Sequence, residues 1–548
     1  MYCNSQGGKS VFIGFLLFFI VQPSAGQAFQ EELRQTLEKS TQESPAQLRG
    51  NRLLKLGEVY PFYAQRNFDP IWSEAGRLTE LAYEFRFELR QSKYDGLQPA
   101  SYHLGLIDAF VATVEKKEAA KEVLLPKELA ELDLLLTDAF FALAEDLELG
   151  KVNPERLQAR WSIPRKRNAL GYDSLLTQAS RTRALRSQLA TLYPKTPSYE
   201  KGKLLLRQLE ERAKEEINWK SIKTDKTIRP GDVSAQIPQV RDRLAFWGYP
   251  TVLVPTDAKM YDSLLREQVL AYQAARGIKV DGVLGQGTLS ALNESPTQLM
   301  DKIRVNLERM RWIPEYFFQG EAVLVNVPSF QLVYRKGADT LFTTKVIVGT
   351  IKHQTPVFTA SLSYLVFSPY WNIPPSIARN ETLPAIRKNS GYLQRNNMEV
   401  VNAAGQPISS SQVNWNAKPF PYLIRQKPGE SNALGQVKFM FPNPNNVYLH
   451  DTPAKQLFEQ DVRTFSHGCI RMQQPRDFAE LLLKNKGDWT SEKVGLAMGQ
   501  GKEEIVNLPY KIPVGIVYFT FLVDAGGQPR FFADVYRRDA ELLALLGR

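Results

Sequence analysis

Cysteine and histidine are scarce in this sequence, with two cysteines and four histidines in 548 residues. A metal site built from thiolate and imidazole ligands needs several such residues at short spacing. His103 and His353 have no partners at that spacing, and one or two cysteines cannot form a thiolate cluster. We therefore predict no metal, and nothing in the sequence indicates another cofactor.

Long apolar runs are also lacking, apart from one near the N-terminus. Lys9 precedes the apolar stretch 11–21, and the small residues 24–26 follow it. This order is typical of a secretory signal, so we expect residues 1–26 to be a signal peptide. The stretch is shorter than the roughly 20 apolar residues of a membrane span, but an uncleaved segment would tie the protein to the inner membrane. The sequence leaves open whether this segment is cleaved or is kept as a membrane anchor.

Removal of the signal would take Cys3 with it and leave Cys469 without a partner in an oxidising compartment. This lone thiol lies in the run Ser466–Arg471, and fifteen residues separate the run from His450. A neighbouring imidazole can take the thiol proton, which lowers the thiol pKa and gives a thiolate nucleophile. The alternative is a buried, inert cysteine. The flanking histidines favour the nucleophile.

The residues around Cys469 suggest supporting roles. Gly468 lets the backbone turn sharply, so the amides of Gly468 and Cys469 could form an oxyanion hole worth roughly 3 kcal/mol per donor. Ser466 and Arg471 could orient the loop or hold a substrate carboxylate, and structural hydrogen bonding is the equal alternative for both.

The formal net charge of +11 favours polyanionic or carboxylate-rich partners. The basic residues are spread along helical segments together with glutamate, so a solvated surface explains them equally well. Nucleic acid is not expected as a partner of an exported protein. At this length, with 43% apolar residues, we expect three or four domains with real cores.

Residues 27–228 show helical periodicity and predict an all-α scaffold. The clearest helix ends at Gly150 and Pro154. Several aromatic residues of this region are expected in its core rather than in a ligand site, namely Phe62, Tyr63, Trp72, Tyr94 and Tyr102.

Residues 229–295 predict a module of three short helices, two of which stop at Gly248 and Gly277. Its segment YQAARGIKVDGVLGQGTLSALN resembles the peptidoglycan-binding domain of bacterial wall hydrolases. Glycan binding is implied by that resemblance, since the glycines and the Asp281-Gly282 turn could be purely structural.

Residues 296–548 begin with a helix and then change to the period-two pattern of strands, as in Val323, Val325 and Val327. A stretch at about 376–430, rich in Asn, Pro and Arg, interrupts this β-rich domain. An insertion of that length is more often a lid than an idle loop. The last strands, 514–523 and 531–535, are expected to form a terminal hairpin.

The segment YLHDTP, followed by SHGCIR, resembles the signature of L,D-transpeptidase catalytic domains. NLERMRW, SPYWNIPPSIA, NALGQVKFMFPN and VYFTFLVDAGGQPRFFADVY resemble the large gram-negative subgroup of that family. The resemblance implies a multidomain α+β protein with a helical scaffold, a peptidoglycan-binding module and a catalytic domain with an inserted lid.

The family implies acyl transfer between peptidoglycan tetrapeptide stems, donor and acceptor, in the gram-negative periplasm. If the family's roles are transferred to this sequence, Cys469 is the nucleophile and His450 is the general base and acid. His467 and Gly468 then support the site and its oxyanion hole. The product would be a 3-3 cross-link, and carbapenem-type compounds would inhibit. Arg471 stands where some members have Asn, which puts amide-specific contacts in doubt.

Two other functions stay open on the sequence. The same acyl-enzyme could react with water, which would make the protein an L,D-carboxypeptidase or an endopeptidase. The helical region and the 229–295 module could also serve as a noncatalytic scaffold that binds the cell wall.

Overall fold

The structure is a computed structural model that describes residues 25–39, 47–157, 161–164, 171–215, 219–250 and 257–547. It divides into two compact units, one drawn from residues up to Arg90, Pro99–Leu143 and Leu170–Gln188, the other from the remaining residues. The predicted signal peptide lies almost wholly outside the described residues. Among the described helices, none has the length and apolar character needed to cross a bilayer.

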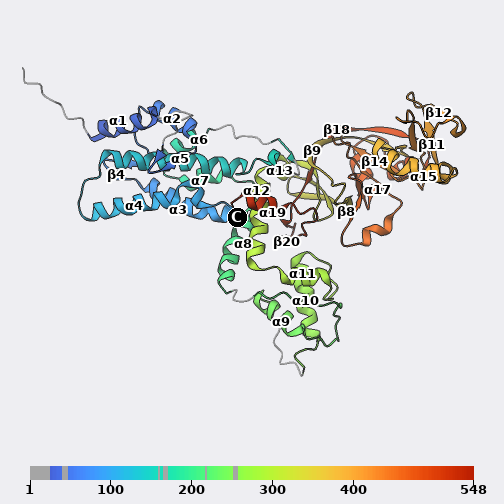
Figure 1. The fold of residues 1–548 in the computed structure, drawn as a ribbon, viewed down its shortest axis with the longest axis horizontal. Coiled ribbons are helices and arrows are strands. Elements are labelled where there is room, and N and C mark those ends of the chain that lie inside the picture. The colour runs from blue at the N-terminus through green and yellow to red at the C-terminus, as the bar shows by residue number, and fades with distance from the viewer. Residues whose placement is uncertain are drawn as a thin grey trace, which may run out of the picture. The chain divides into compact units, whose positions relative to one another are not determined.

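The first unit is helical (Figure 1), as predicted for the scaffold. Its helices come from α1 (Ala25–Glu38), α2 (Leu56–Gln65), α3 (Glu80–Gln91), α4 (Leu104–Ala119), α5 (Pro126–Leu149), α6 (Tyr172–Thr182) and α7 (Leu185–Ala190). Phe62, Tyr63, Trp72 and Tyr102 are buried there, which confirms their expected place in the core. The helix α5 ends just before Gly150, which has a φ of +80°.

The second unit contains a three-helix module that follows α8 (Pro197–Lys214). The module consists of α9 (Ile237–Phe246), α10 (Ser263–Arg276) and α11 (Gln286–Asn293), packed around its own apolar core. The predicted helix ends at Gly248 and Gly277 are confirmed, because both residues adopt positive φ. Gln273 is fully buried and bonds to both sides of the Asp281-Gly282 turn, which ties the turn to α10.

The catalytic part of this unit is a closed sheet. Its strands are β6 (Glu321–Asn326), β7 (Gln331–Lys336), β8 (Asp339–Gly349), β9 (Val357–Phe367), β14 (Val437–Met440), β15 (Leu449–His450), β17 (Ile470–Met472) and β18 (Glu504–Val517). The order runs β14-β15-β17-β8-β7-β6-β18-β9, and β14 also pairs with β9, so the ring closes into a barrel. The strand β16 (Thr464–Ser466) pairs with β8, and β5 (Trp161–Ser162) with β9.

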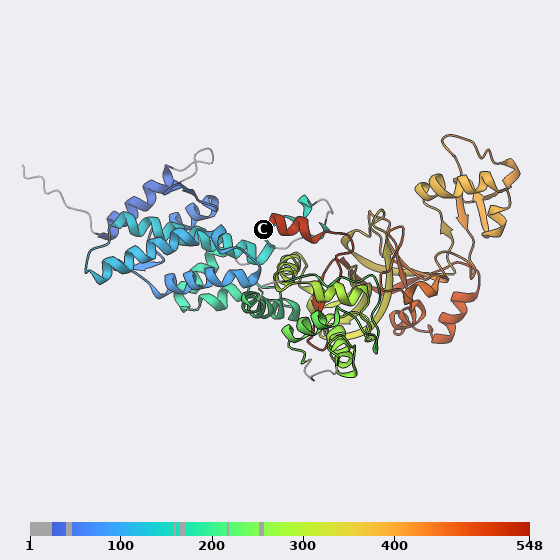
Figure 2. The same ribbon diagram turned by 60° about the horizontal axis from the view of Figure 1, so that its bottom comes forward.

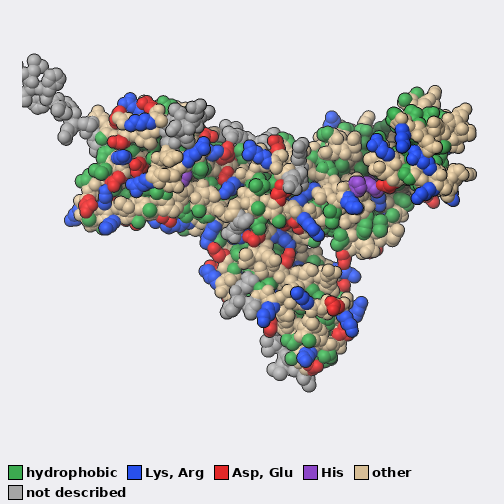
Figure 3. Space-filling view, viewed as in Figure 1, with side chains coloured by type: hydrophobic (Ala, Val, Ile, Leu, Met, Phe, Trp, Pro, Cys, Tyr) green, Lys and Arg blue, Asp and Glu red, His purple; other side chains and the backbone are tan. Residues whose placement is uncertain are grey.

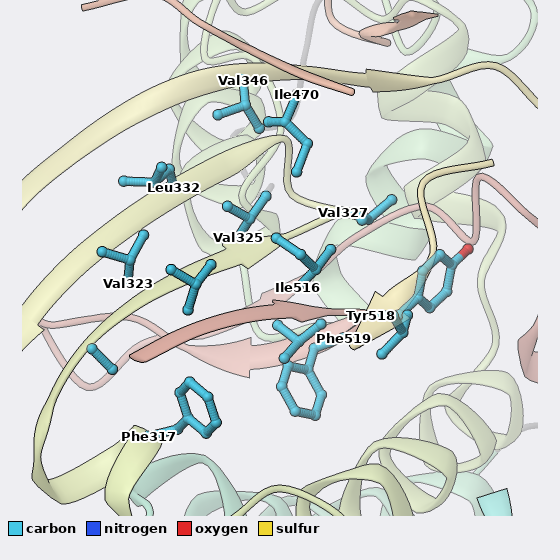
Figure 4. Packing of buried hydrophobic residues seen from close by; sticks show 14 of the residues in the cluster. Phe317, Val323, Val325, Val327, Leu332, Val346, Ile470, Ile516, Tyr518 and Phe519 are labelled. Atoms are coloured by element: carbon cyan, nitrogen blue, oxygen red, sulfur yellow. The ribbon is translucent and has the colours of Figure 1, made fainter. Parts of the chain in front are cut away.

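Alternate residues of the strands fill the barrel (Figure 4). Val323 and Val325 of β6 and Val327 just after it lie there with Leu332 and Ile470, and all are fully buried. This confirms the period-two prediction for the region. Because Leu449, Ile470 and Met472 are also in this core, the residues between them along each strand point to the other face.

Helices cover the barrel. These are α12 (Pro296–Arg311), α13 (Tyr316–Gln319), α17 (Pro475–Leu483), α18 (Ser491–Gly499) and α19 (Asp539–Leu545). The helix α12 starts with a capping box between Ser295 and Gln298 and packs on α8. The predicted terminal hairpin is shorter than expected. Of the predicted strand 514–523, residues 514–517 belong to β18 and pair with β6. The hairpin itself is formed by β19 (Phe521–Val523) and β20 (Pro529–Phe531).

The predicted lid is a folded lobe (Figure 2) rather than an irregular loop. It contains a sheet of β10 (Trp371–Asn372), β13 (Leu423–Gln426), β11 (Met398–Val401) and β12 (Pro407–Ile408). Its short helical segments are α14 (Pro375–Ile377), η4 (Ala378–Thr382), α15 (Leu383–Lys388), α16 (Tyr392–Arg395) and η5 (Ser410–Gln412). It has its own apolar core, with Leu383, Val400 and Ile424. Elements this short give little periodicity, which explains the weak sequence signal.

Candidate active site

Strand register brings the predicted site residues together. In β15, Leu449 pairs with Ile470 of β17, and His450 pairs with Arg471 in a parallel ladder. The Ile470 amide donates a hydrogen bond to the Tyr448 carbonyl at 3.1 Å. Cys469 therefore lies beside Tyr448, and both precede a core-facing residue. Tyr448, His450, Cys469 and Arg471 consequently share the face of the sheet opposite the core.

The imidazole of His450 has a defined tautomer. Its Nδ1 lies 2.5 Å from the backbone oxygen of Asp451. Because a carbonyl oxygen only accepts, Nδ1 carries the proton and Nε2 keeps a free lone pair. His450 is buried, at 4% exposure. That burial, and then the positive charge of Arg471, lower the pKa of His450 to about 3, although the carbonyls of Asp451 and Leu434 favour the protonated form. The group is thus a neutral base at pH 7.

Asp451 is itself held in place, so the carbonyl that orients His450 is fixed. The Gln436 amide donates to Asp451 Oδ2 at 2.9 Å, and Lys455 Nζ lies 2.6 Å from Oδ1. The Asp451 amide donates to the Val437 carbonyl at 2.9 Å. A Cβ on Gly435 would lie 2.3 Å from Oδ2, so this close approach requires glycine. Sequence reasoning missed Asp451 as an orienting group.

The thiol of Cys469 is half-buried, and its sulfur lies 3.8 Å from the Asn446 carbonyl oxygen, to which it donates. Burial raises the pKa of Cys469, while hydrogen bonds from the backbone and side chain of Tyr448 lower it to a smaller extent. The prediction of a lowered thiol pKa is therefore wrong for this structure, because burial outweighs the favourable contacts. Within the described residues the thiol makes no hydrogen bond to His450, which lies diagonally across the two strands.

The loop before β17 is closed by Ser466. Its Oγ donates to the Cys469 carbonyl at 2.5 Å and accepts from the Gly468 amide at 3.1 Å. Gly468 has a φ of +114°, a conformation that strains any other residue. The sharp turn at Gly468 is thus confirmed. Its amide was expected to be an oxyanion donor, but in this structure it donates to Ser466 Oγ instead. The Cys469 amide makes no hydrogen bond within the described part of the chain and is free to act as one.

A second set of hydrogen bonds fixes this loop to the barrel. Thr355 Oγ1 donates to the Gly468 carbonyl at 2.9 Å and accepts from the Gly349 amide at 2.9 Å. The Tyr536 hydroxyl donates to the Gly349 carbonyl at 2.6 Å. The sequence analysis did not predict a role for Thr355, Gly349 or Tyr536 in the site. The only signal for Thr355 was its place before Pro356 in a predicted loop, and Tyr536 gave none because it lies far away in sequence.

His467 contacts the inserted lobe. Its Nε2 lies 3.0 Å from Glu381 Oε1 of η4, and its ring centroid lies 5.1 Å from that of His353. Both His467 and Glu381 are exposed. Figure 3 shows histidine side chains at the surface beside a group of Lys and Arg side chains. His467 thus links the catalytic loop to the lid, and His353 is a surface residue beside it.

In the described ranges, no cluster of three or more His, Cys, Asp or Glu residues is placed to hold a metal ion. The side chains gathered on this face of the sheet are a thiol, a neutral imidazole, a phenol and two cations, since Lys438 of β14 pairs with His450 on its other side.

Family comparisons match three parts of the chain. Residues 57–206 match the scaffold domain, residues 233–292 the "Putative peptidoglycan binding domain", and residues 320–495 the L,D-transpeptidase catalytic domain. The last match contains the site and the lid. The fold and the matches define a multidomain protein whose catalytic domain is of a peptidoglycan-acting class.

A curated relative, the "Putative L,D-transpeptidase" of Haemophilus influenzae, is 31% identical over 248 residues. The match covers 45% of this chain and 50% of the relative, so the chain spans about half the length of the curated relative that it matches. Together with the domain matches, it shows that the β-rich part of the chain is similar to L,D-transpeptidase catalytic domains, as the sequence motifs predict.

Solved L,D-transpeptidases are similar to the chain at low identity. The enzyme from Xylanimonas cellulosilytica shares 14% identity, with a TM-score of 0.16, over 54% of this chain and 99% of its own. The enzyme from Stackebrandtia nassauensis shares 14%, with a TM-score of 0.19, over 54% and 96%.

Proposed function

We propose that this protein is an L,D-transpeptidase that joins peptidoglycan stem peptides by 3-3 cross-links through an acyl-enzyme on Cys469. The observation that carries the proposal is the placement of Cys469 and His450 on one face of two paired strands, with the imidazole neutral and its Nδ1 proton held by Asp451. A cysteine nucleophile and its general base act on the same substrate, so their side chains must emerge on the same face, as these two do. The peptidoglycan-acting domains support a location in the cell envelope, and we propose the periplasm.

In the first half-reaction, His450 Nε2 takes the thiol proton as the sulfur attacks the carbonyl carbon that links the third stem residue to the terminal D-alanine. The Cys469 amide donates to the developing oxyanion. Burial and the neighbouring sulfur raise the pKa of Tyr448, so its hydroxyl keeps its proton and donates toward the reacting centre. The amide C–N bond then breaks, the imidazolium gives its proton to the leaving nitrogen, and D-alanine departs, leaving a thioester.

In the second half-reaction, a side-chain amine of an acceptor stem attacks the thioester carbonyl. His450 takes a proton from the attacking nitrogen and returns it to the sulfur as the C–S bond breaks. The new amide bond is the 3-3 cross-link, and the free thiol is restored. If water attacks instead, the same steps release a tripeptide, which is the carboxypeptidase reaction.

The test uses the full chain with purified tetrapeptide stems and follows the products by mass spectrometry. We expect a dimer linked between the third residues of two stems, together with free D-alanine. Cys469→Ala should form no dimer and no covalent adduct with a carbapenem. Hydrolysed tripeptide without dimer would replace the transpeptidase by a carboxypeptidase. A wild-type chain that forms neither product nor adduct would leave only the wall-binding scaffold.

A further inference from the structure

Two cations flank the catalytic imidazole. In the antiparallel ladder of β14 and β15, Lys438 pairs with His450, and on the other side His450 pairs with Arg471 of β17. Val437 and Phe439 of β14 lie in the barrel core, as do Leu449 and Ile470. Alternation therefore turns Lys438 to the same face as His450, Cys469 and Arg471. The three side chains form a row, cation, imidazole and cation, across neighbouring strands.

Neither cation has an anionic partner in the described part of the chain. The Arg471 guanidinium makes no hydrogen bond there, and its Nε is buried without a partner. The Lys438 ammonium makes no ion pair or side-chain hydrogen bond in the same residues. Its nearest opposing charge is that of Glu503, whose Oε2 accepts from the Tyr370 amide at 2.9 Å.

Other buried cations of this unit have partners, either a carboxylate or backbone carbonyls, which for Arg463 are those of Val346 and Phe330. Arg311 and Glu308 form a fully buried ion pair at 2.8 Å, and Arg309 lies 2.6 Å from Asp539. An unpaired cation that is partly removed from water is costly, and burial accordingly lowers the pKa of both Lys438 and Arg471. Two unpaired cations beside a nucleophile indicate a site that binds an anionic group of the substrate, because that anion would supply the missing partner.

The donor stem of the proposed reaction carries one such anion close to the reacting carbon. Its terminal D-residue has a free α-carboxylate, and the scissile carbonyl belongs to the residue just before it. Neighbouring residues of a chain lie about 3.8 Å apart between Cα atoms, and cross-strand neighbours about 5 Å. A donor whose carbonyl lies at Cys469 therefore brings its carboxylate within reach of the row.

We propose that Lys438 and Arg471 bind the terminal α-carboxylate of the donor stem, and that they restrict the enzyme to donors that end in a free D-amino acid. This inference rests on the proposed acyl transfer and specifies its donor. Arg471 supplies two parallel N–H donors for the carboxylate, and Lys438 adds a second positive charge. Stems whose terminal carboxyl is blocked would lose both contacts.

The test compares a tetrapeptide donor that ends in free D-alanine with the same peptide as its C-terminal amide. Release of D-alanine or of D-alaninamide is followed by mass spectrometry to give kcat/KM for each. We expect the wild type to prefer the acid at least tenfold. Arg471→Gln and Lys438→Gln should each lower kcat/KM for the acid by a larger factor than kcat/KM for the amide, mainly through KM, so that the preference falls. Lys484→Gln removes an exposed charge just after α17 and is the matched control.

Each outcome decides a different point. If the wild type releases neither product, the proposed acyl transfer fails. If it processes acid and amide equally well, acyl transfer stands and the carboxylate site is overturned. If a variant lowers both rates by the same factor, its cation acts through His450 or through folding, and the inference is also overturned. Arg471→Lys keeps a charge without the two parallel donors and should restore part of the acid preference, which a damaged fold would not.

Discussion

The free enzyme should hold Cys469 as a neutral thiol, and alkylation can test this. The pKa of Cys469 is raised above its ordinary value of 9.0, and that of His450 is lowered to about 3. Taken separately, pKa values of about 9 and about 3 would favour the neutral pair over the thiolate–imidazolium pair by about 8 kcal/mol, before the attraction between the two charges of that pair is counted. A turnover of about one per second has a barrier of about 17 kcal/mol, so the proton transfer fits within the barrier.

The assay is the rate of reaction of Cys469 with iodoacetamide between about pH 5 and pH 10, followed by mass spectrometry. Because only the thiolate reacts, we expect the rate to rise throughout this range, without a plateau near neutrality. His450→Gln should leave the profile almost unchanged, since a neutral imidazole does not stabilise the thiolate. A rate that is already constant from pH 6, and that drops in His450→Gln, would show a preformed ion pair and refute this reasoning.

Three substitutions test other parts of the site. Tyr448→Phe should slow acylation by roughly 100-fold with little change in donor KM, because it removes a donor worth about 3 kcal/mol, and stopped-flow acylation by a carbapenem measures this. Gly468→Ala should lower the acylation rate at least tenfold, because its φ of +114° strains a side chain by about 1–3 kcal/mol at the catalytic loop. Gly527→Ala, which introduces similar strain in the terminal hairpin, should keep full activity, and equal losses in the two variants would contradict the role of the turn. Glu381→Gln should change kcat/KM by less than about fivefold, because an exposed ion pair with His467 is worth at most about 1 kcal/mol. Added salt should shrink the difference between Glu381→Gln and the wild type, and a loss of more than 100-fold would show that this contact does more than hold the lid.

The sequence was sufficient to predict that Cys469 and His450 lie close together in one candidate site. Cys469 and His450 follow or precede recognisable strand segments, and a lone thiol in an exported chain with histidines nearby is a strong local signal. Three features of the fold were predictable for the same reason. These are the helical scaffold, the helices of the 229–295 module that end at glycine, and the alternation of buried residues along β6. Each depends on residues that are close together in the chain.

The electrostatics of the site were not predictable, because they depend on register and burial. Lys438 reaches His450 only through the pairing of β14 with β15, and Tyr536 reaches the catalytic loop from the far end of the chain. The direction of the Cys469 pKa shift depends on how much water the fold removes from the sulfur, which no local pattern reports. The fold of the inserted segment was not predictable either, since its sheet is made of strands two to four residues long.

Carboxylate binding and the strength of the base are coupled in this site. Arg471 and Lys438 both lower the pKa of His450, because they repel its protonated form. A donor carboxylate bound between them would cancel much of this repulsion, and His450 would become a stronger base only with donor in place. The acid limb of kcat, which reports the enzyme–donor complex, should therefore lie at higher pH than the acid limb of kcat/KM, which reports the free enzyme. With the amide donor the two limbs should coincide. Coincident limbs for the acid donor would mean that the carboxylate does not lie between the two cations.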